Sequence, residues 1–158
     1  MSVYDKTFDM VIDKALNILF DKKVDIYTFA LYYDHEGWAV EVCADTVYNS
    51  QRTVRASNAF NREQFFAAIK RSDLETATVW NCNTGRSFSL GEFQYKMLGW
   101  EPIKAPNNSV PFFRAMVRAL IRNSHKIAAL TRNPEQLVLC CSTKNSEVGL
   151  IWFHEDGA

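Results

Sequence analysis

The stretch IYTFALYYDHEGWAVEVCAD, residues 26–45, decides the fold prediction for this chain. Two runs of β-branched and aromatic residues flank the turn formers of DHEG, which predicts a β-hairpin with a tight two-residue turn. Such a turn pairs Tyr33 with Trp38 across the hairpin. Leu31 then lies opposite Val40, and an apolar face continues down both strands.

The other face of this hairpin is mixed in character, because successive side chains on a strand point to opposite sides. It carries Thr28, Ala30, Tyr32, Ala39, Glu41, Cys43 and Asp45. A strand pair with one apolar and one mixed face has one buried side, and its second side is wet or covered by another surface. This pattern predicts architecture and does not state a function.

Helices are predicted on both sides of this hairpin in the chain. Apolar residues recur with helical spacing over residues 3–20, which indicates an amphipathic helix. Capping-box patterns predict helices that begin at Asn61 and near Ser89, and the latter is expected to stop at Gly99. A long helix is expected from near Pro111 into the 120s.

The remaining elements are predicted to be strands. Short strands are expected at residues 51–56 and 76–82, and a second hairpin at residues 137–154 with Leu139 opposite Trp152. Both faces of the second hairpin are apolar, so we expect it in the middle of the sheet. The fold class is therefore α+β, a mostly antiparallel sheet containing two β-hairpins and packed against about four helices. At 158 residues, a single globular domain over 1–158 is expected.

The charge balance argues against nucleic acid and anionic membranes as partners, because 18 basic and 18 acidic side chains cancel. The charges are unevenly distributed, since residues 1–50 carry nine acidic and four basic groups. This predicts an acidic surface on the amino-terminal third. Aromatic residues make up 13% of the chain, which suits both a thick core and a protein interface.

No pattern of catalytic or metal-binding residues is present. The four cysteines show no CxxC and no ligand spacing with histidine, and His35, His125 and His154 are scattered. GxGxxG, P-loop, HExxH and GxSxG motifs are missing, so we predict no metal, no cofactor and no enzymatic activity. The first residues lack the basic-then-apolar pattern of a signal peptide, and no apolar run is long enough for a membrane span. A reduced, cytoplasmic location is expected.

The most ordered polar pattern lies on the predicted long helix. Its members are Arg114, Arg118, Arg122 and Lys126, spaced four residues apart. Side chains at this spacing form a basic ridge along one side of a helix, and such a ridge can hold phosphates or carboxylates. With the proline-rich loop at residues 101–111, it provides an alternative hypothesis, namely a small-ligand or anion-binding protein or an undetected enzyme.

The segments IYTFALYYD, DHEG, WAVEVCADT and FSLGEFQYKMLGW together resemble an uncharacterised bacterial domain family. That family is similar in layout to the cytoplasmic immunity proteins encoded beside polymorphic or contact-dependent growth inhibition toxins. The resemblance covers about the first hundred residues, and the chain departs from the pattern after Trp100. It implies a protein that occludes a cognate toxin by stoichiometric binding, and it carries over no active-site residue.

Two binding hypotheses follow from the first hairpin. An immunity protein would contact a basic nuclease toxin through the acidic side of the hairpin. The residues expected to make this contact are Asp25, Tyr32, Glu36, Glu41 and Asp45. If Ile26, Tyr32 and Ala39 form an uncovered patch, a homodimer through the same face is the other hypothesis.

Overall fold

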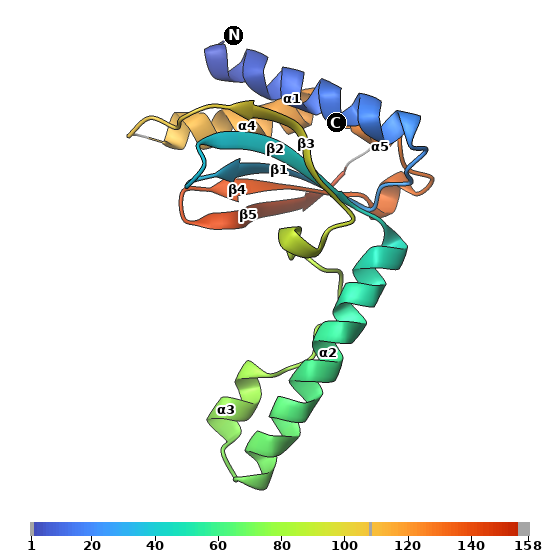
Figure 1. Cartoon of the computed structure of the whole chain (residues 1–158), viewed down its shortest axis with the longest axis vertical. Helices are drawn as coiled ribbons and strands as arrows, with labels where there is room; N and C mark the ends of the chain where they lie inside the picture. The colour runs from blue at the N-terminus through green and yellow to red at the C-terminus, as the bar shows by residue number, and fades with distance from the viewer. Residues whose placement is uncertain (1, 108, 155–158) are drawn as a thin grey trace.

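A five-stranded sheet in the order β3-β2-β1-β4-β5 forms the centre of the protein (Figure 1). The computed structural model describes residues 2–107 and 109–154. The helices are α1 Val3–Asp21, α2 Val47–Lys70, α3 Leu74–Val79, α4 Val110–Arg122 and α5 Ser124–Ala128, with 3-10 turns at Leu90–Glu92 and Pro134–Gln136. The strands are β1 Thr28–Asp34, β2 Ala39–Asp45, β3 Tyr95–Pro102, β4 Val138–Thr143 and β5 Ser146–Phe153. The predicted α+β class with a mostly antiparallel sheet is confirmed.

The helix α1 forms where the amphipathic pattern predicts it, one residue longer at its end. Ser2 caps it, since the Ser2 hydroxyl accepts from the Asp5 backbone N–H and the Asp5 carboxylate accepts from the Ser2 backbone N–H. Its apolar stripe, which includes Phe8, Ile12 and Leu19, is fully buried against the sheet. α4 lies beside α1 on the same face of the sheet (Figure 1).

The register of β1 and β2 differs by two residues from the prediction. Leu31 lies opposite Val42 rather than Val40, because the turn holds four residues instead of two. The Asp34 carboxylate causes this, since its Oδ1 accepts from the backbone N–H groups of Glu36 and Gly37, both at 3.0 Å. Because side chains alternate with a period of two, a two-residue shift leaves every residue on its predicted face.

The β4–β5 pairing has the predicted register, with Leu139 opposite Trp152. The predicted position of this pair in the sheet is wrong in part. β4 pairs in parallel with β1, but β5 is an edge strand. Apolar residues on both faces of β5 therefore do not indicate a central strand, since no residue of β5 is fully buried and Ile151 and Phe153 are exposed.

Three further predicted elements have a different structure. Residues 51–56 are not a strand but part of the continuous helix α2, which Thr46 caps. Residues 76–82 are not a strand either, because Asp73 caps the short helix α3 by accepting from the Thr76 N–H. Among the described residues there are five α-helices instead of about four.

Gly99 does not end a helix, because residues 95–102 form β3 and pair with β2. The capping-box pattern near Ser89 gives only the 3-10 turn at Leu90–Glu92, and sheet pairing dominates the residues that follow. Gly99 has φ +65° and lies against α1, where a Cβ atom would overlap the Val11 carbonyl oxygen. Glycine is required at this position by both conformation and space.

Candidate functional site

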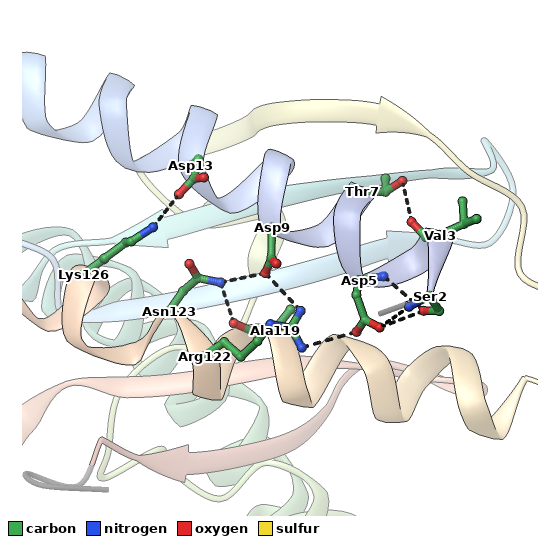
Figure 2. Close-up of polar contacts among 10 residues, drawn as sticks. All are labelled: Ser2, Val3, Asp5, Thr7, Asp9, Asp13, Ala119, Arg122, Asn123 and Lys126. Carbon is green, nitrogen blue, oxygen red and sulfur yellow. Dashed lines mark hydrogen bonds and ion pairs between the residues drawn. The ribbon is translucent and has the colours of Figure 1, made fainter.

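A row of ion pairs joins α1 to α4 and α5 (Figure 2). The Arg122 guanidinium lies 3.3 Å from the Asp5 carboxylate and 3.0 Å from that of Asp9. One turn further on, the Lys126 ammonium lies 3.3 Å from Asp13. The four-residue spacing of Arg122 on α4 and Lys126 on α5 thus matches the four-residue spacing of acidic groups on α1, and the opposite charges pair.

These contacts change the interpretation of two predicted surfaces. Arg122 and Lys126, two members of the predicted anion-binding ridge, are paired within the chain. Arg114 and Arg118 are exposed and form no ion pair with the described residues. The acidic amino-terminal third is also partly neutralised, since three of its carboxylates lie in this row. Its Asp5 has a lowered pKa, chiefly because of the hydrogen bonds from Ser2, with Arg122 adding to the effect.

The predicted partner-binding residues do not form one exposed surface. Asp25 and Glu36 are exposed and Tyr32 is half-buried, but Glu41 is 9% exposed and Asp45 is 0% exposed. The expectation that the last two are accessible to a partner is wrong. Asp25 is also engaged, because its Oδ1 accepts from the Arg132 backbone N–H at 3.0 Å.

The second face of the sheet is buried because the segment 86–93 crosses it. Leu90 and Phe93 pack there on three small strand residues, Ala30, Cys43 and Cys140. These small side chains leave room for a covering layer, whereas large ones would have filled the face themselves. The sequence signal for this layer was the set of apolar residues in FSLGEF, namely Phe88, Leu90 and Phe93.

Asp45 is the polar junction between β2, α2 and this covering segment. Its Oδ1 accepts from Asn49 Nδ2 at 2.7 Å and from the Gln94 backbone N–H at 3.2 Å, while Asn49 Nδ2 also donates to the Glu92 carbonyl. Asp45 Oδ2 has no hydrogen-bond partner among the described residues. Burial raises the pKa of this carboxyl above its ordinary value, although the bonds from Asn49 and Gln94 oppose the rise.

Glu41 faces a small cavity of about 270 Å³ at the edge of the covering segment. The lining residues are Tyr32, Glu41, Cys43, Leu90, Gly91, Lys96, Met97 and Glu147. Burial raises the pKa of Glu41, and a hydrogen bond from the Met97 backbone N–H opposes the rise. This cavity brings together two of the predicted contact residues, Tyr32 and Glu41.

The helices α2 and α3 form an arm, residues 47–80, that extends away from the sheet (Figure 1). Only Asn49, Ser50 and Ala68 of α2 and Ala77 of α3 are buried. The returning chain is tied to α2 by a reciprocal pair of hydrogen bonds between Asn58 and Asn83, at 2.9 and 2.8 Å. Large apolar side chains are exposed along the arm, namely Val47, Tyr48, Phe60, Phe66, Ile69, Leu74 and Val79.

The three buried cysteines are not activated as nucleophiles. Burial raises the pKa of the Cys43 and Cys141 thiols to about 12, and Cys140 is also buried with a raised pKa. Cys82 is the exposed thiol. No group of three or more His, Cys, Asp or Glu side chains that could hold a metal ion occurs within residues 2–107 and 109–154.

None of the helices in the described part of the chain combines the length and apolar character that crossing a bilayer requires. No protein-family model, curated protein or solved structure matches this chain.

Proposed function

We propose that this chain is a non-enzymatic binding protein that acts by forming a stoichiometric complex with another protein. The single observation that carries the proposal is the arm, residues 47–80, which extends from the sheet and keeps large apolar side chains in water. Leu74 and Val79 are 69% and 71% exposed. Apolar side chains that gather on an extended element are typical of an interface with another protein.

The composition of the arm favours protein contact over contact with a small molecule. Phe60 packs edge-on against Trp80 with ring centroids 5.6 Å apart, which gives the arm a firm aromatic centre. Rigid aromatic and aliphatic anchors are the side chains that dominate binding energy at protein interfaces. The arm also carries five basic and three acidic residues, so a partner surface that is apolar with an acidic rim would complement it.

The most concrete form of this proposal is a cytoplasmic immunity protein that neutralises a cognate bacterial toxin. The resemblance in layout of the first hundred residues supports it, and so does the missing catalytic pattern in the sequence. An interface of standard size buries about 1,600 Å² in total, so we expect the contact to include further surface beside the exposed arm. The exposed residues Asp25 and Glu36 remain candidate contacts, whereas Glu41 lines a cavity and Asp45 is fully buried.

The test is co-purification of the chain with the products of its neighbouring genes, followed by light scattering to determine stoichiometry. We expect a one-to-one complex with a toxin domain, and protection of cells that express that toxin. Arm variants Leu74→Asp and Val79→Asp should weaken the complex at least tenfold. Matched variants on the body, Val3→Asp and Val110→Asp, replace equally exposed apolar residues and should leave it intact.

Two outcomes would contradict this proposal. The first is a complex that is as tight with the arm variants as with the unmodified chain. The second is a chain that forms a homodimer through the arm and binds no neighbouring gene product, since the arm would then serve self-association.

A further inference from the structure

We infer that the cavity over Tyr32 and Glu41 binds a single cationic side chain, an arginine or lysine of the protein partner. This inference deepens the proposed function and rests on it. It concerns the face of the sheet opposite α1 and α4, and it uses neither the arm nor the basic ridge.

The lining residues form a row across four strands at the turn end of the sheet. Glu41 on β2 lies directly opposite Tyr32 on β1, and Glu147 lies at the start of β5. β3 closes the other side, where its pairing with β2 is irregular on both sides of Val42. A cavity of about 270 Å³ is large enough for one long side chain and too small for a cofactor.

The irregular pairing of β3 positions the carboxylate of Glu41. Met97 has φ +56°, a conformation that side chains with a Cβ atom rarely adopt, and its backbone N–H donates to Glu41. Strained backbone of this kind persists where the surrounding structure fixes it, and it is common at binding sites. Glu41 is thus a largely buried carboxylate that lines the cavity beside Met97.

The electrostatics of the cavity favour a positive guest. Glu41 and Glu147 outnumber the single lining cation, Lys96, whose ammonium already donates to the Gly91 carbonyl at 2.9 Å. The pKa of Tyr32 is raised to about 12, first by burial and then by the nearby charges of Glu147, Asp34 and Glu41. Several negative charges therefore act on this one site, and a guest cation would offset the cost of burying Glu41.

The remaining lining residues fit the rest of an arginine or lysine side chain. The Tyr32 ring offers an aromatic surface for a guanidinium or ammonium group. Leu90 and Met97 provide apolar walls for the aliphatic stem, as such side chains commonly bury the stem and leave only the head polar. A divalent metal is disfavoured, because no cluster of three or more potential ligands lies within the described residues.

The test is a nuclear magnetic resonance titration of the full chain with N-acetyl-arginine-methylamide, with the glutamine analogue as the neutral control. We expect saturable shifts at Gly91 and Met97 but not at Gly85, with a dissociation constant on the order of 10 mM, because single ion-pair and cation–π contacts in an open cavity are weak. Glu41→Gln keeps an oxygen for the Met97 N–H and should weaken binding at least tenfold. Glu135→Gln, an exposed change outside the cavity, should leave binding unchanged.

Equal shifts with the glutamine analogue, or no saturable shift at Gly91 and Met97, would overturn the inference. The source of the cation is tested separately with a purified complex. The arginine probe should displace the partner, and Glu41→Gln should weaken the complex. If the probe and agmatine both bind but the complex is unaffected, the site takes a free small cation and the assignment to a partner side chain is wrong. If no partner exists, the titration still reports on the cavity, so failure of the proposed function is distinguishable.

Discussion

Gly99→Ala tests how closely β3 packs on α1. A left-handed backbone costs about 1–2 kcal/mol for a residue with a Cβ atom. The added methyl group would also overlap the Val11 carbonyl oxygen and contact Lys14, and an overpacked site of this kind costs about 1–3 kcal/mol more. We therefore expect the free energy of unfolding to fall by about 2–5 kcal/mol, and the melting temperature by about 4–20 °C.

The assay is urea unfolding followed by tryptophan fluorescence and by circular dichroism. Gly91→Ala is the matched control, because no atom lies within 4 Å of the Cβ that it would add. We expect the control to change the free energy of unfolding by less than about 0.5 kcal/mol. The packing of β3 on α1 would be refuted if Gly99→Ala were as stable as the unmodified chain, or if both variants lost the same stability.

Arg122→Ala should lower the free energy of unfolding in urea by about 1–2 kcal/mol, because it breaks two partly buried ion pairs. The control Arg118→Ala should change it by less than about 0.5 kcal/mol. Equal effects of the two changes would count against the ion-pair row. A thiol reagent should modify Cys82 alone in the folded protein and all four thiols in denaturant; rapid labelling of more than one native thiol would contradict the burial of the others. The raised pKa of Asp45 means that its contribution to stability is greatest at low pH and is lost as pH rises through the folded pKa. The stability of Asp45→Asn relative to the unmodified chain should therefore rise as pH increases from 4 to 8, by no more than about 1.4 kcal/mol per pH unit. A constant stability difference across this range would argue that Asp45 is not buried as a carboxylate.

The faces of β1 and β2 could be predicted from the sequence, although their register could not. Alternation assigned Phe29 and Tyr32 to opposite faces, and that assignment tolerates a shift of two residues. The register depended on the loop, where the Asp34 carboxylate binds two backbone N–H groups and lengthens the turn. A tight turn and this wider turn have the same turn-forming residues, so composition could not distinguish them.

Local pattern was misleading where tertiary contacts or caps determine the structure. Residues 76–82 contain β-branched and aromatic residues, yet the Asp73 side chain caps a helix there. Residues 95–99 followed a helical cap pattern, yet pairing with β2 makes them a strand. Both errors arise because short segments have weak intrinsic preferences, which a single cap or a neighbouring strand can override.

The candidate site was predictable only in part. Tyr32 and Glu41 were correctly placed on one face, but the predicted register put Tyr32 opposite Ala39 rather than Glu41. Their burial was not foreseen because it depends on a segment about fifty residues later in the chain. The arm was missed, since α2 was divided into a strand and a shorter helix. The apolar residues of the arm do not lie along one side of the helix, and several of them are therefore exposed.

The most direct test of the central claim is hydrogen exchange of the arm in the free chain and in the purified complex. Few side chains of residues 47–80 are buried, so their amides should exchange readily in the free protein. The account predicts strong protection of α2 and α3 when the partner binds, with little change in α1. Protection confined to other parts of the molecule, with unchanged exchange throughout the arm, would contradict the claim that this protein binds its partner through the arm.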